Sequence, residues 1–116
     1  MIEKLGIGID IVSIDDFKKM ELNKNIKFYR NIFLESELEY CKKFKNPYVR
    51  FAGKFAIKEA VKKSIKRNVS MLNIETHHMN SKPIIKLVNS KDHYNFLVSL
   101  SHEKEYAIAV VISEKI

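Results

Sequence analysis

The pattern of hydrophobic and polar residues is most regular between residues 48 and 66, where apolar side chains recur at the spacing of an α-helix. Every fourth residue lies along one side of this helix: Phe51, Phe55, Glu59 and Lys63. A helix that needed only solubility would place its charges opposite the aromatic rings, so we interpret Glu59 as an acid at the rim of a buried surface. The alternative is an ordinary surface pair of Glu and Lys, which stabilises a helix by about 0.3–0.5 kcal/mol.

Shorter patterns on both sides of the long helix predict one strand before it and further strands after it. The expected strands cover residues 4–12, 72–78, 84–88, 96–101 and 106–112. Helices are expected at residues 13–20 and 35–44, with a helical or turn-like segment at 28–33. The stretch 106–112 lacks polar alternation, which predicts burial on both faces. Together these elements predict an α+β fold, in which an antiparallel sheet packs against the long central helix and shorter helices.

Length and composition indicate a folded protein and narrow the setting in which it works. With 116 residues, of which 46% are hydrophobic, the chain 1–116 is expected to form a single domain. Its apolar stretches are far shorter than the roughly 20 residues that cross a bilayer, and we expect no membrane association. Early acids such as Glu3 and Asp10 do not fit a signal peptide. Cys41 is the only cysteine, which excludes an internal disulfide and favours the cytoplasm.

The net charge of +7 favours a polyanionic partner. Nucleic acid, an anionic membrane surface, an acidic protein and a phosphorylated metabolite all meet that description. The basic residues are spread along the chain and form no run long enough for a nucleic-acid tail. A solvated, lysine-rich surface also explains much of the charge.

Three short motifs carry a resemblance to a known family. Gly-Ile-Asp at residues 8–10 lies in the first strand, Phe-Ala-Ile-Lys-Glu-Ala at 55–60 lies on the long helix, and Ser-Leu-Ser-His at 99–102 precedes the last strand. In this order and spacing the chain resembles the holo-(acyl carrier protein) synthases, the small bacterial 4′-phosphopantetheinyl transferases, over nearly its whole length. The resemblance implies an enzyme that moves 4′-phosphopantetheine from coenzyme A to a serine of apo acyl carrier protein and releases adenosine 3′,5′-bisphosphate, a step of fatty acid biosynthesis. It also implies a homotrimer with active sites between subunits.

The same resemblance assigns a metal site and two catalytic residues. Asp10 and Glu59 match the two acids that hold magnesium in the family, and a hard cation of this kind binds few carboxylates together with water and phosphate oxygens. Lys63 matches a lysine near the transferred phosphate, where we favour a clamping role, while Glu59 is the candidate base. For Asp10 the alternative is a capping or turn acid after a strand.

A further set of residues is expected to contact coenzyme A: Arg50, Lys54, Lys58, Lys63, Ser101 and His102. Arg50 and Lys54 could meet its 3′-phosphate, although simple surface charge explains them equally well. Lys58 fits the family's Lys-Glu pair, or else points outward from the helix. Ser101 and His102 are adjacent on a strand and therefore face opposite ways, which argues against a serine-hydrolase pair.

Some positions depart from the family pattern. Asp16 stands where these synthases often carry an arginine that meets the acidic carrier protein, so docking is expected to depend on other cations: Lys18, Lys19, Lys24 or Lys27. A hairpin at 81–83 reads Ser-Lys-Pro rather than Gly-Lys-Pro. Two alternatives stay open at this point, namely a small basic nucleic-acid-binding domain and a non-catalytic relative that only binds a carrier protein.

Overall fold

The long helix predicted from the sequence is the centre of the fold. The computed structural model describes residues 2–116, and in it α4 (Pro47–Ile65) lies within one residue of the predicted range. The Asn46 side chain accepts a hydrogen bond from Tyr48 N at 3.2 Å, and Pro47 occupies the first turn, so the helix start is fixed by local chemistry. The helix ends at Ile65, and the capping residue that follows, Lys66, has a left-handed backbone with φ of 55°.

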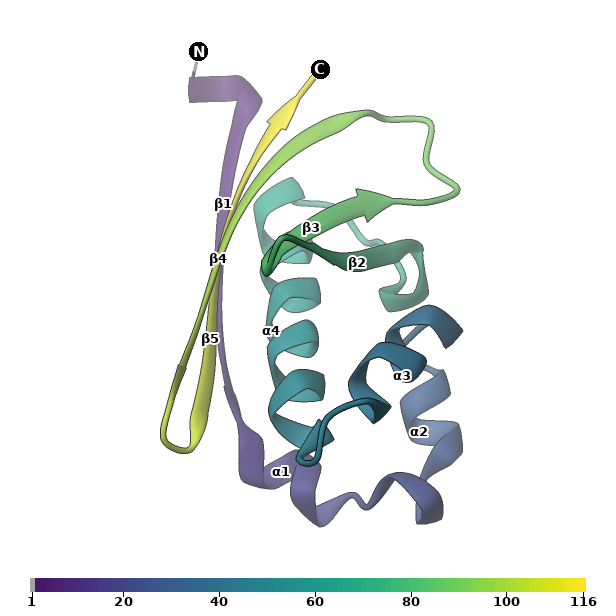
Figure 1. Cartoon of the computed structure of the whole chain (residues 1–116). Helices are drawn as coiled ribbons and strands as arrows, with labels where there is room; N and C mark the ends of the chain where they lie inside the picture. The colour runs from purple at the N-terminus through teal and green to yellow at the C-terminus, as the bar shows by residue number, and fades with distance from the viewer. Residues whose placement is uncertain (1) are drawn as a thin grey trace.

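A three-stranded antiparallel sheet covers one side of α4 (Figure 1). Its strands are β1 (Leu5–Ser13), β4 (Tyr94–Glu103) and β5 (Tyr106–Lys115), in the order β1-β5-β4. The register places Asp10 opposite Ala109, and Ala109 opposite Leu100. The two edge strands of this sheet, β1 and β4, therefore come from opposite ends of the chain.

Two glycines allow α4 to lie directly on β1. A methyl group on Gly8 would clash with the carbonyl oxygen of Ala60, and one on Gly6 would clash with that of Ser64. The backbones of strand and helix are therefore in contact, with no side chain between them on the strand side.

The first two strands after α4 form a second, separate sheet, which corrects the expectation of one sheet. β2 (Ile74–Met79) pairs with β3 (Lys82–Leu87) as a two-stranded hairpin. Asn80 and Ser81 both have positive φ, at 51° and 68°, as two-residue turns of this hairpin class require. In Figure 1 the hairpin and the N-terminal helices lie on the side of α4 away from the larger sheet.

Three short helices complete that side: α1 (Ile14–Lys19), α2 (Ile26–Arg30) and α3 (Glu35–Lys42). Short 3-10 turns lie at Ile2–Lys4, Leu22–Lys24 and Met71–Asn73. Aromatic rings join these helices to α4, since Tyr29 contacts Phe51 with ring centroids 4.7 Å apart and Phe17 contacts Phe55 at 5.6 Å. The Tyr29 hydroxyl also donates to Met20 O at 2.6 Å. The predicted α+β class is confirmed, and no helix within residues 2–116 is both long and apolar enough to cross a membrane.

The last strand is buried on one face only, which corrects the prediction of burial on both. Ala107, Ala109 and Val111 face α4 and are fully buried. Ile112, on the other face, is 39% exposed. The helix α4 covers only the inner face of the sheet. The outer face carries exposed apolar side chains, which we call the outer apolar face: Leu5, Ile7, Ile9, Ile11, Leu97 and Ile112.

Candidate functional site

The predicted metal ligand Asp10 and the predicted catalytic Lys63 are in direct contact. Asp10 lies on the face of β1 that looks toward α4. Lys63 Nζ donates to Asp10 Oδ1 at 3.1 Å and to Ile9 O at 2.9 Å. The Asp10 side chain is mostly buried and the Lys63 side chain is half exposed. The pair thus lies at the edge of the sheet, open to solvent on one side.

Glu59 precedes Lys63 by one helical turn and shares its side of α4. It is half-buried, as expected for an acid at the rim of a packed surface. We call Asp10, Glu59 and Lys63 the β1-edge site. The two carboxylates can bind a hard divalent cation, and the ammonium can pair with a phosphate bound to that cation.

The β1-edge site offers fewer protein ligands than a closed metal site. Residues 2–116 contain no group of three or more His, Cys, Asp or Glu side chains placed to hold a metal. Two carboxylates suit Mg²⁺, which keeps several waters and takes substrate phosphate oxygens as its remaining ligands. The residues present therefore fit magnesium bound with a phosphorylated substrate, and they fit Zn²⁺ poorly.

A second site lies at the other edge of the sheet, where β4 approaches the start of α4 and the hairpin. A pocket of about 340 Å³ opens there, which we call the β4-edge pocket. Its walls include Tyr40, Arg50, His78, Ser81, Pro83 and His102. The guanidinium of Arg50 lies 4.1 Å from the centroid of the Phe44 ring, which holds its charge at the pocket wall.

His102 lies on the inner face of β4 with its ring against α4. A methyl group on Gly53 would be 3.1 Å from His102 Nε2, so the helix leaves just enough room for the ring. Burial of the ring lowers the pKa of His102, and the nearby Arg50 charge lowers it further. A hydrogen bond with the Val49 backbone opposes this shift, and the net lowering of the pKa favours the neutral imidazole near pH 7.

His78 stacks face to face on Tyr40, with ring centroids 4.7 Å apart and planes 6° from parallel. Its Nδ1 atom is buried and has no hydrogen-bond partner within residues 2–116. Burial lowers the pKa of His78 to about 4, and Lys54 and Arg50 add to the effect. The ring is thus a neutral part of the wall of the β4-edge pocket.

The lowered pKa of His78 predicts that the stability of the fold depends on pH. Because the unfolded state binds a proton near pH 6.5 and the folded state only near pH 4, stability is fully retained above pH 6.5 and falls as the pH drops toward 4. The loss should be about 2 kcal/mol, allowing for partial exposure of the ring. Urea unfolding at pH 7 and pH 4 would show a smaller loss for His78→Gln than for the wild type. Equal losses in both proteins would contradict the prediction.

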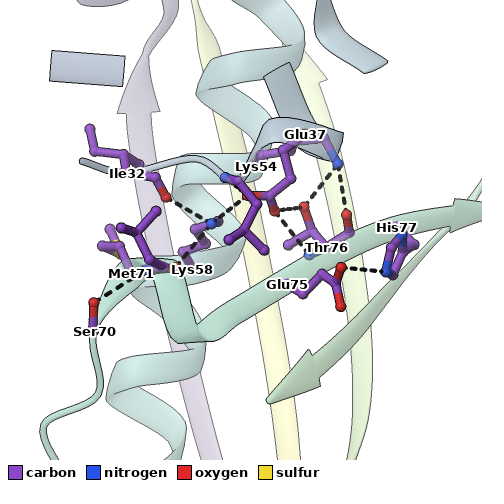
Figure 2. A network of polar contacts seen from close by, with 11 residues as sticks. Ile32, Glu37, Lys54, Lys58, Ser70, Met71, Glu75, Thr76 and His77 are labelled. Atoms are coloured by element: carbon purple, nitrogen blue, oxygen red, sulfur yellow. Dashed lines mark hydrogen bonds and ion pairs between the residues drawn. The ribbon is translucent and has the colours of Figure 1, made fainter. Parts of the chain in front are cut away.

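Lys54 and Lys58, which were predicted to contact coenzyme A, are both buried in the fold. Both side chains are buried, at 2% and 0% exposure. Lys58 Nζ pairs with Glu37 Oε1 at 2.6 Å and donates to two backbone carbonyls, those of Ile32 and Met71 (Figure 2). Burial lowers the pKa of both lysines, and the Glu37 carboxylate opposes that shift. Their donors are engaged inside the protein, so they hold the fold together.

Ser101 faces away from His102, as the alternation of side chains along a strand predicts. Ser101 pairs with Ile108 on the outer face of the sheet, whereas His102 pairs with the buried Ala107. Adjacent residues of a strand point to opposite faces.

The β1-edge site and the β4-edge pocket lie on opposite flanks of α4. Arg50 and Glu59 are nine residues apart in this helix, which is about two and a half turns, so their side chains point in opposite directions. In the sheet, β5 separates the strands of Asp10 and His102. The structure thus joins Asp10 to Lys63, one helical turn from Glu59, and separately places Arg50 and His102 in the wall of one pocket.

Sequence reasoning missed Glu37 as an important residue. Its carboxylate is 1% exposed and accepts hydrogen bonds from Lys58 and Thr76 and from Leu34 N. One signal was present, because Glu37 shares the inner stripe of α3 with Leu38 and Cys41, where a charge requires a buried partner.

Comparisons with known proteins agree on one family. Residues 6–111 match the family described as the 4′-phosphopantetheinyl transferase superfamily. The chain is 37% identical over 117 residues to a holo-[acyl-carrier-protein] synthase of Chlamydia trachomatis, covering 94% of this chain and 98% of the relative. It is 39% identical over 117 residues to the Bacillus cereus synthase, covering 95% of each.

Solved structures show the same relationship. A holo-(acyl-carrier-protein) synthase from Bacillus anthracis, in complex with CoA (3′,5′-ADP), matches with a TM-score of 0.80 and 35% identity over 96% of each chain. The Helicobacter pylori synthase, in complex with coenzyme A, has a TM-score of 0.80 and 33% identity over 93% of this chain and 99% of that one. The chain therefore belongs to the 4′-phosphopantetheinyl transferase superfamily, among the holo-[acyl-carrier-protein] synthases.

Proposed function

We propose that the chain transfers 4′-phosphopantetheine from coenzyme A to a serine of apo acyl carrier protein, with magnesium bound at Asp10 and Glu59. The observation that carries the proposal is the contact between Asp10 and Lys63, one helical turn from Glu59. Sequence identity to synthases over nearly the whole chain supports the same reaction.

The reaction breaks the pyrophosphate of coenzyme A and makes a phosphodiester. The serine oxygen attacks the phosphorus that carries pantetheine, and adenosine 3′,5′-bisphosphate leaves with the bridging oxygen. Negative charge grows on that oxygen, and a magnesium ion held by Asp10 and Glu59 would supply positive charge to offset it. Lys63 would add a second positive charge beside the phosphates, and Glu59 is the proposed acceptor of the serine proton.

The nucleotide end of coenzyme A would occupy the β4-edge pocket. Arg50 gives that pocket a fixed positive charge suited to a phosphate, and neutral His102 can hydrogen-bond phosphate or sugar. The related structures from Bacillus anthracis and Helicobacter pylori contain coenzyme A or its product, which supports a coenzyme site in this family.

We further infer a homotrimer in which each active site joins the β1-edge site of one subunit to the β4-edge pocket of the next. One coenzyme molecule would have to wrap around α4 to reach both sites in a single chain. The outer apolar face, where Ile7 is 68% exposed and Leu97 71%, gives a second copy a surface to cover. A cytoplasmic location suits the one free cysteine, Cys41, which is buried and needs no oxidising compartment.

An interfacial site predicts that two inactive variants restore activity when mixed. Glu59→Gln impairs the β1-edge site and His102→Ala impairs the β4-edge pocket, so each alone should be nearly inactive. After unfolding and refolding together in equal amounts, roughly a quarter of the interfaces would carry both intact parts, and activity should recover to about that fraction. Refolding each variant alone is the control. If the mixture stays as inactive as the separate variants, the site lies within one chain.

Intact-mass spectrometry of an apo acyl carrier protein tests the reaction itself. Incubation with this chain, coenzyme A and magnesium should add one phosphopantetheine group to the carrier. A chelator or the Glu59→Ala substitution should abolish the gain. If a folded wild-type protein modifies none of several carriers, the chain is a non-catalytic relative that only binds them.

A further inference from the structure

Two side chains hydrogen-bond the backbone of β2 along the edge that does not pair with β3. Among residues 2–116, β2 pairs only with β3, so its other edge presents backbone groups that need partners. At Thr76 those partners are Glu37 of α3 and Lys54 of α4 (Figure 2). Thr76 N donates to Glu37 Oε2 at 2.9 Å, and Thr76 O accepts from Lys54 Nζ at 3.2 Å. A carboxylate and an ammonium thus take the place of a neighbouring strand.

The hydroxyl of Thr76 joins the same two charges. It donates to Glu37 Oε2 at 2.6 Å and accepts from Lys54 Nζ at 2.8 Å. All three side chains are at most 2% exposed, so water does not compete for these bonds. One residue of the hairpin is therefore fixed by four buried hydrogen bonds to two different helices.

This anchor lies close to the β4-edge pocket. Two residues beyond Thr76 along β2, His78 stacks on Tyr40, and the Lys54 ammonium lies 4.7 Å from the centroid of the same Tyr40 ring. The hairpin then supplies Ser81 and Pro83 to the pocket wall. The position of that wall relative to Arg50 and His102 thus depends on how firmly β2 is held.

We propose that Thr76, held between Glu37 and Lys54, is a positioning residue for coenzyme binding, which fixes the β2–β3 hairpin as one wall of the nucleotide pocket. The inference rests on the proposed function, because it takes the β4-edge pocket to be the place of the nucleotide. Thr76 touches no substrate in this scheme. Its effect is on affinity for the nucleotide, and the transfer step at the β1-edge site is separate from it.

Thr76→Val tests the proposal, because valine keeps the shape of the side chain and removes the hydroxyl. We expect KM for coenzyme A and Kd for adenosine 3′,5′-bisphosphate to rise about tenfold, with kcat changed less than about twofold. Backbone amides of the hairpin should exchange with solvent about tenfold faster in the free protein. Thr76→Ser, which retains the hydroxyl, should restore both affinity and protection.

Two further variants separate positioning from general loss of stability. Lys54→Met removes the other partner of the Thr76 hydroxyl and should reproduce the rise in KM. Ile65→Val loosens the core at the far end of α4 and should leave KM and hairpin exchange unchanged.

The possible outcomes are distinct. Unchanged KM and Kd in Thr76→Val, or unchanged exchange in the hairpin, would overturn the proposal. An equal rise of KM in Ile65→Val would do the same. If the wild type modifies no carrier, the proposed function fails, and nucleotide binding and amide exchange still decide whether Thr76 positions the pocket.

Discussion

Replacing Glu59 with Gln should lower kcat/KM for carrier-protein modification by at least about 10³-fold, equivalent to about 4 kcal/mol of transition-state stabilisation. The substitution keeps the size of the side chain and removes one of the two carboxylate charges at the β1-edge site. Asp10 alone would then hold the metal, and its carboxylate is already paired with Lys63 at 3.1 Å. The rate should be measured by carrier mass gain at several magnesium concentrations.

Glu39→Gln provides a matched control for this experiment. Glu39 is an exposed acid on α3 whose ion pair with Lys42 is 3.8 Å long, so its neutralisation changes net charge equally and should leave the rate unaffected. Both variants should unfold at nearly the same temperature as the wild type. A loss below about tenfold for Glu59→Gln would remove this residue from the catalytic role.

Replacing Glu37 with Ala should cost about 3–5 kcal/mol of folding free energy, a large share of the stability of a small domain. The change leaves the Lys58 ammonium buried without its carboxylate and removes the acceptor of Thr76 N. Desolvated charge without a partner is far more costly than the loss of an exposed pair. Urea denaturation monitored by circular dichroism would give the free energy of unfolding.

The double variant Glu37→Ala/Lys58→Met separates the ion pair from the rest of the network. Removing both charges should recover part of the stability that Glu37→Ala loses, because no unpaired ammonium is then buried. Glu39→Ala, on the exposed side of the same helix, should change stability by less than about 0.5 kcal/mol. A loss below about 1 kcal/mol for Glu37→Ala would show that water reaches the network.

The sequence predicted the elements better than their arrangement. The spacing of Phe51, Phe55 and Glu59 located α4 because a helix of this length has a strong periodic signal. The hairpin was predicted as part of the main sheet because strand patterns carry no information on which strands pair. The last strand shows no alternation of apolar and polar residues because both of its faces are apolar. Within a single chain, however, only the face toward α4 is buried.

The fold brings some of the predicted site residues together and keeps others apart. The family motifs predicted a site at Asp10 and Glu59, and the packing of β1 on α4, which the sequence does not show, brings the strand of Asp10 against the helix of Glu59. The burial of Lys54 and Lys58 could not be predicted, because their partners, Thr76 and Glu37, come from other elements 22 and 21 residues away in sequence. Local charge patterns cannot distinguish a buried lysine with distant partners from a lysine at a ligand site.

The backbone contact between β1 and α4 has a consequence for how the protein tolerates mutation. Since Gly6 and Gly8 lie against helix carbonyls, the separation of Asp10 from Glu59 is set by main-chain atoms. Substitutions that enlarge or shrink side chains on the far side of α4 can change stability and leave this separation untouched. The core should therefore accept considerable sequence drift among relatives, while alanine at either glycine would push strand and helix apart and disable the site without altering any of its chemical groups.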